Sequence, residues 1–130
     1  MKIVFFLSVI MDNQVFTLLV HDAPYGRETS SLAYLFAQEV VKNHCLRAVF
    51  FYEDGVLNAI RGMNPASDEF NLVKSWIALA KEHQVRLVIC ESAGERRGIN
   101  NITAEGSFEI GSLSDAASFS LRSDKLVQFR

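Results

Sequence analysis

Four short apolar runs along the chain have the length and composition of buried β-strands. Each run is rich in β-branched, aromatic or aliphatic residues, and turn-forming residues stop the first two at Asp22 and at Asp54 with Gly55. Runs without a polar face are typical of parallel sheets, which are covered on both sides. The predicted strands are Val15–Val20, 48–52, Arg86–Cys90 and Lys125–Phe129.

The segments between these runs have apolar residues at three- and four-residue spacings, the pattern of helices that bury one face. The first helix follows the candidate capping residues Thr29 and Ser30 and is expected to end near His44. Another is expected to begin behind the cap at 67–69, where acidic residues favour a helix N-terminus, and to end near His83. Shorter helical stretches are predicted at 56–60, 91–97 and 114–121, and a polar connection covers 100–111.

The alternation of strands and helices predicts an α/β fold. We expect a single three-layer domain, with a mainly parallel sheet of four to five strands and helices on both faces. The 130 residues, 49% of them hydrophobic, suffice for one core, and we assign 15–130 to this domain. In such sheets, sites lie beyond the carboxyl ends of the strands, because loops and helix N-termini converge there.

Residues 1–14 are interpreted as an apolar N-terminal extension. One cation followed by an apolar run imitates a secretory signal, but no small-x-small cleavage site follows it, and the run is too short to span a bilayer. Two interpretations stay open. Either the start codon lies upstream of the natural start, with Met11 the more natural beginning, or the segment is an extra strand or tail lying on a partner subunit.

Charge and cysteine content narrow the function classes. A net charge of -2 offers no general attraction for phosphate backbones, so we expect no direct nucleic-acid contact and no membrane association. Cys45 and Cys90 match neither a disulfide framework nor a zinc pattern, which fits a reducing, cytoplasmic compartment. Because His21, His44 and His83 lack metal-site spacing, we expect no metal and no cofactor.

Cys90 is the sharpest candidate for chemistry. It ends a predicted strand and precedes a predicted helix, and helix N-terminal amides together with Arg96 and Arg97 would stabilise the nucleophilic thiolate. Glu91 and Glu95 would oppose this effect. A buried cysteine that serves as a small hydrophobic residue is the alternative interpretation.

Two loops are expected at the same edge of the sheet as Cys90. The loop 22–31 could cradle an anion, as in a flavodoxin-like nucleotide site. It lacks the glycine and lysine pattern of phosphate-binding loops, however, and simple capping of the following helix is an alternative explanation of its sequence. Cys45, near a helix C-terminus, is assigned to packing. The candidate loop residues of the site are Tyr25, Gly26, Ser30, Tyr52 and Asn58.

Five segments follow one another in an order that is typical of a known family. They are the opening strand with 24–26 and Ser30, then 49–52 with 55–56 and Asn58, then 65–70 with Trp76, then Cys90 with 96–98, and 123–129. In this order they resemble the DsrE/TusD family. The likeness covers roughly residues 15–129, and the stretch between Arg97 and the last helix is shorter here than in the family pattern.

The resemblance implies a sulfurtransferase that accepts a persulfide on Cys90 from a TusA-like donor and passes it to a TusE-like acceptor. It further implies TusB/TusC-like paralogous subunits as partners, and a homo- or hetero-oligomer that is a trimer or hexamer. The assembly would serve 2-thiouridine synthesis at the wobble position of transfer RNA. A structural subunit with an idle cysteine and a dissimilatory sulfur-trafficking protein are the alternatives. Sulfur relay by this route requires Cys90 to be reachable from solvent.

Overall fold

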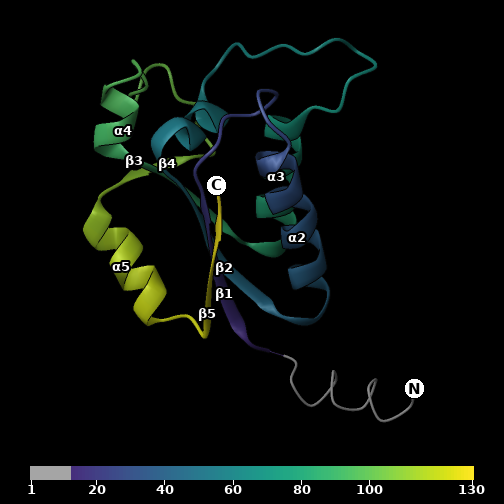
Figure 1. Ribbon diagram of the computed structural model, residues 1–130, viewed down its shortest axis with the longest axis vertical. Coiled ribbons are helices and arrows are strands. Elements are labelled where there is room, and N and C mark those ends of the chain that lie inside the picture. Colours follow the sequence, from purple (N-terminus) through teal and green to yellow (C-terminus); the bar gives the residue numbers. More distant parts are fainter. Residues whose placement is uncertain (1–12) are drawn as a thin grey trace.

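The computed structural model describes residues 13–130, so 1–12 of the expected extension lie outside the described residues. Within 13–130, five parallel strands form one sheet in the order β4-β3-β2-β1-β5. Helices cover both faces (Figure 1), which confirms the predicted three-layer α/β fold. The strands are β1 (Val15–Val20), β2 (Cys45–Phe51), β3 (Arg86–Cys90), β4 (Glu109–Gly111) and β5 (Lys125–Phe129).

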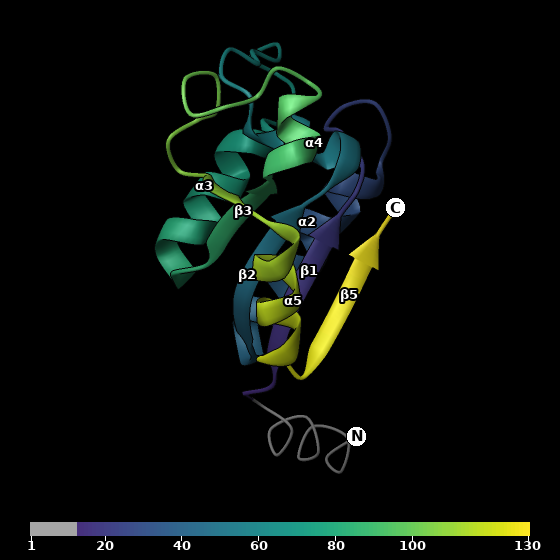
Figure 2. The same cartoon turned by 90° about the vertical axis from the view of Figure 1, so that its left-hand side faces the viewer.

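The helices are placed by the direction in which the chain winds. From β1 to β3 the chain moves toward one edge of the sheet, with α2 and α3 on one face. After β4 it crosses back through α5 on the other face, which α4 also covers, and adds β5 beside β1 (Figure 2). The helical elements are α2 (Thr29–Asn43), the 3-10 helix η1 (Glu53–Ala59), α3 (Leu72–His83), α4 (Glu91–Glu95) and α5 (Leu113–Leu121).

Both predicted helix caps were wrong. At the start of α2 the capping position belongs to Glu28, without a side-chain cap, and the Ser30 hydroxyl donates instead to the Asp22 carbonyl. At α3 the cap is Asn71, whose side-chain oxygen accepts from the Lys74 backbone N–H at 3.1 Å. Asparagine is among the preferred N-cap residues, so α3 begins later than the predicted cap at 67–69 suggested.

The core lies on both faces of the central strands. Phe50 and Phe51 are fully buried, and because they are neighbours on β2 their side chains point to opposite faces of the sheet. The Phe51 ring lies edge-on to Trp76 of α3, with ring centroids 5.5 Å apart. Trp76 is therefore a core residue. None of the helices within 13–130 is long and apolar enough to cross a membrane.

Candidate functional site

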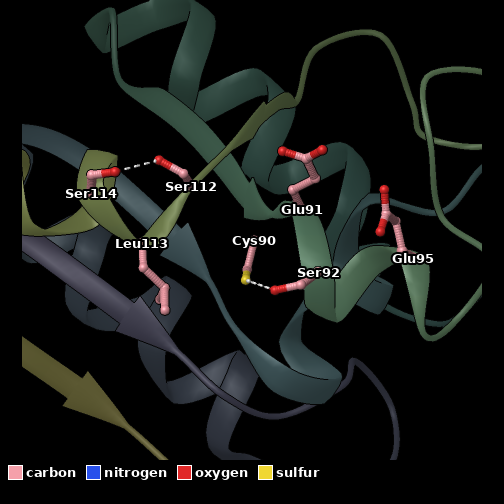
Figure 3. A pocket seen from close by; sticks show the side chains of 7 residues that line it. All are labelled: Cys90, Glu91, Ser92, Glu95, Ser112, Leu113 and Ser114. Carbon is pink, nitrogen blue, oxygen red and sulfur yellow. Dashed lines mark hydrogen bonds between the residues drawn. The ribbon is translucent and has the colours of Figure 1, made fainter.

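The register between β3 and β4 builds a pocket around the candidate cysteine. Cys90, the last residue of β3, is paired with Gly111, the last residue of β4. The segments that follow the two strands therefore lie side by side at the carboxyl edge of the sheet, where a site was expected. They enclose a pocket of about 410 Å³ (Figure 3). Its lining residues are Cys90, Glu91, Ser92, Glu95, Ser112, Leu113 and Ser114.

Cys90 is more deeply buried than the sequence suggested. Its residue surface is only 2% exposed, because β3 has a neighbour on each side and α4 packs over the strand end. The thiol is therefore not freely exposed at the strand end, and access from solvent depends on the pocket beside it. The thiol borders the pocket, and its Sγ lies 3.6 Å from the Ser92 Oγ, toward which it points in Figure 3. A reaction partner must approach Cys90 through this pocket.

The two candidate arginines form no hydrogen bond with Cys90 in the described structure. The Arg97 Nε donates to Asp54 at 2.8 Å, and the same guanidinium donates to the Ala93 carbonyl at 2.9 Å. Arg96 is exposed and follows the C-terminal end of α4. Arg97 therefore links α4 to η1. No hydrogen bond in the described structure supports the expectation that Arg96 and Arg97 stabilise a Cys90 thiolate.

The candidate loop residues form a separate cluster that does not line the pocket of Cys90. Ser30 and Asn58 are fully buried, and both donate to the Asp22 carbonyl, Asn58 at 3.2 Å. Tyr25 holds the loop against the start of α3, because its hydroxyl donates to the Phe70 carbonyl at 3.0 Å and accepts from the backbone N–H of the residue at the helix start. These residues fix loop conformations.

The remaining candidates also lie outside the pocket. Tyr52 packs edge-on against His21, with ring centroids 5.5 Å apart, and Gly26 is exposed. Cys45 is the first residue of β2 and is exposed, so its assignment to packing was wrong. It lies at the start of a strand whereas Cys90 ends one, and both thiols are free. No cluster of metal-ligating side chains occurs among the described residues.

The β4–α5 side of the pocket was missed in the sequence because β4 is only three residues long. A pattern that could have revealed it is Ser112-x-x-Asp115, the capping-box arrangement that opens a helix. In the structure Asp115 accepts from the Ser112 backbone N–H at 2.8 Å, and the Ser112 hydroxyl accepts from the Asp115 backbone N–H at 3.3 Å. This box fixes the position of the two serines that line the pocket, Ser112 and Ser114.

The capping box predicts a measurable pH dependence. Hydrogen bonds from Ser112 hold the pKa of Asp115 below its usual range, the backbone N–H contributing most. A depressed carboxylate pKa adds stability that is present above the unfolded-state pKa of about 4 and is lost as the pH falls through the folded-state pKa. We therefore expect Asp115→Asn to flatten the fall in thermal midpoint below about pH 4. The exposed Asp68→Asn serves as control and should follow the wild-type curve, so identical curves for the two variants would contradict the expectation.

Comparisons with known proteins now define the class. A family model described as DsrE/DsrF-like matches residues 14–129. The sulfurtransferase TusD of Buchnera aphidicola is 43% identical over 126 residues, which cover 88% of this chain and 98% of the relative. A sulfurtransferase TusD homolog of Vibrio parahaemolyticus is 42% identical over 132 residues, 92% of this chain and 100% of the relative.

Solved structures share the architecture. The crystal structure of the ychN protein from E. coli has a TM-score of 0.74 and 26% identity, covering 89% of this chain and 99% of that one. A protein of unknown function from Methanobacterium thermoautotrophicum, 14% identical over 89% of this chain and 99% of its own, has a TM-score of 0.63 and shows the fold alone. The chain belongs to the DsrE/DsrF-like family. It is a sulfurtransferase, as its TusD relatives are.

Proposed function

We propose that Cys90 accepts a sulfane sulfur as a persulfide and passes it to the thiol of a downstream carrier. The observation that carries this proposal is the position of Cys90, at the carboxyl end of β3 with its Sγ bordering the pocket, in a chain whose relatives are sulfurtransferases. Of the two cysteines, Cys90 combines a fixed position with a pocket in front of it. Cys45 lies at the opposite end of its strand and lines none of the described pockets.

The proposed transfer consists of two exchange steps at sulfur. In the first step the Cys90 thiolate attacks the outer sulfur of the donor persulfide, the donor S–S bond breaks, and the donor leaves as a thiolate. In the second step the carrier thiolate attacks the outer sulfur on Cys90, and the Cys90 thiolate is the leaving group. The sulfur changes carrier without net oxidation or reduction, so neither a metal nor an organic cofactor takes part. The Ser92 hydroxyl, 3.6 Å from Sγ, can donate a hydrogen bond to the departing thiolate.

The proposed pathway is a cytoplasmic relay for 2-thiouridine synthesis at the transfer RNA wobble position. Its donor would be a TusA-like protein, its acceptor a TusE-like protein, and its neighbours TusB/TusC-like subunits, while a separate enzyme modifies the RNA. The names of the TusD relatives support this assignment. The chemistry at Cys90 would be the same in dissimilatory sulfur trafficking, where the carriers differ.

Mass spectrometry tests the proposal directly. The exposed Cys45 can take up sulfur without specificity, so the assay uses Cys45→Ser protein incubated with a persulfide donor. We expect one added sulfur on Cys90, lost again when an acceptor thiol is added. The matched Cys45→Ser/Cys90→Ser variant should take up none. The proposal fails if the Cys45→Ser protein remains unmodified, or if both variants gain equal amounts of sulfur.

The burial of Cys90 favours a second candidate, a structural subunit with an idle cysteine. A thiol that is 2% exposed among strand neighbours behaves as a small hydrophobic residue in many cores. This candidate predicts that Cys90, in the Cys45→Ser protein, resists alkylation until the protein is unfolded. Rapid alkylation of Cys90 in the folded protein would rule it out.

A further inference from the structure

Two glutamates dominate the charge of the pocket that Cys90 borders. Glu91 and Glu95 both line it and both are exposed. They are four residues apart on α4, so they share one face of the helix. In Figure 3 their carboxylates point away from the Cys90 sulfur, so the charge lies at the rim.

No cation compensates these carboxylates within 13–130. Neither glutamate takes part in an ion pair there, although other surface acids do, as with Glu39 and Lys42 at 2.8 Å. The other lining residues of the pocket are uncharged. Arg97 is held by Asp54, and Arg96 is not among the lining residues. The mouth of the pocket therefore carries a net negative charge.

The fold itself explains only one of the two glutamates. Glu91 is in the first turn of α4, where the helix dipole favours a carboxylate. Glu95 is in the last turn, where the dipole disfavours one, and like charges four residues apart repel. Cations from outside the chain would offset both unfavourable effects.

We propose that the pocket of Cys90 selects a carrier whose cysteine is flanked by lysine or arginine, through attraction to Glu91 and Glu95. This inference rests on the proposed persulfide function of Cys90. A visiting thiol must enter the pocket to reach the outer sulfur, which brings the residues beside the visiting cysteine over the acidic rim. Flanking cations would hasten encounter and stabilise the attacking thiolate of the carrier.

Model acceptors test the selectivity without knowledge of the carrier. Cys45→Ser protein is loaded with persulfide, freed of donor, and mixed with peptides of equal length whose single cysteine is flanked by either two lysines or two glutamates. The loss of added sulfur from Cys90 is followed by mass spectrometry. Each rate is divided by the rate of the same peptide with glutathione persulfide, which removes the peptides' own difference in thiol reactivity.

We expect the lysine peptide to react about tenfold faster than the glutamate peptide at low ionic strength, because two surface ion pairs form with the first peptide and like charges repel the second. The ratio should shrink as salt is added. Glu91→Gln/Glu95→Gln should bring it to within about twofold. The control Glu39→Gln/Glu82→Gln changes net charge equally on α2 and α3, across the sheet, and should keep the tenfold ratio.

The outcomes separate this inference from the proposed function. If Cys90 loads and discharges but the normalised rates of the two peptides are equal, the charge selectivity is wrong and the persulfide function stands. The inference is equally wrong if the control variant loses the preference as much as Glu91→Gln/Glu95→Gln. If Cys90 takes up no sulfur, the proposed function fails and the inference fails with it.

Discussion

Replacing Trp76 with alanine is expected to lower the free energy of unfolding by about 4 kcal/mol, within the range for truncating a buried aromatic residue. Trp76 is completely buried between Tyr34 and Phe51, with edge-on ring contacts at 5.2 and 5.5 Å. It therefore joins α2, α3 and β2, and alanine would lose both ring contacts. Urea unfolding at neutral pH measures the change, which should appear as a lower midpoint with an unchanged slope.

A Trp76→Phe variant provides the control. The Trp76 indole N–H is buried without a hydrogen-bond partner in the described part of the chain. Phenylalanine keeps much of the ring contact and removes this unpaired donor, whose burial is unfavourable by about 1–3 kcal/mol. We therefore expect Trp76→Phe to lose at most about 1 kcal/mol, since the two effects oppose each other. Equal losses for both variants would contradict this description of the core.

Local pattern was sufficient to predict most of the sheet. The apolar runs at β1, β3 and β5 are bounded by polar or turn-forming residues, and their ends agree with the sequence prediction. For β2 the prediction began three residues late, because Arg47 interrupts the apolar pattern although it belongs to the strand. The position of Cys90 followed from its place at the end of β3.

The surroundings of Cys90 depend on contacts between distant segments, which local pattern does not record. Its burial arises from strand pairing on both sides, and three of the seven residues that line its pocket come from the segment after Gly111. The partner of Arg97 is Asp54, more than forty residues earlier in the chain. Proximity of Arg97 to Cys90 in sequence was therefore a poor guide to the direction of its side chain.

Burial of the proposed nucleophile has a chemical consequence. A persulfide on a fully exposed cysteine would meet every small thiol in the surrounding solution, and the outer sulfur would be lost to them. In the structure the approach to Cys90 leads through a pocket of about 410 Å³, with hydroxyls and two carboxylates on its walls. If Cys90 carries the sulfur as proposed, such a pocket would restrict which acceptor thiols reach it. Burial of Cys90 would then favour selectivity in the proposed relay.

Replacing Gly55 with alanine is expected to destabilise the protein by about 3 kcal/mol, at the upper end for overpacking. A methyl group at Gly55 would lie 2.1 Å from the Val20 carbonyl oxygen, a backbone atom that cannot rotate away. The Gly55 N–H also donates to the carbonyls of His21 and Tyr52 at 3.0 and 2.8 Å, so η1 is held against the end of β1. Urea unfolding measures the loss.

The same substitution should reach the pocket of Cys90. Asp54 in η1 is paired with Arg97, which follows the end of α4 in the chain, so displacement of η1 would shift α4. In the Cys45→Ser protein we therefore expect the alkylation rate of Cys90 to change several-fold. Gly26→Ala is the matched control, since no atom lies within 4 Å of its added methyl group, and it should change stability by less than about 0.5 kcal/mol. If the two glycine variants unfold at the same urea midpoint, η1 does not pack against β1 as described. If Gly55→Ala lowers stability but leaves the alkylation rate of Cys90 unchanged, the Asp54–Arg97 pair does not transmit the shift to α4.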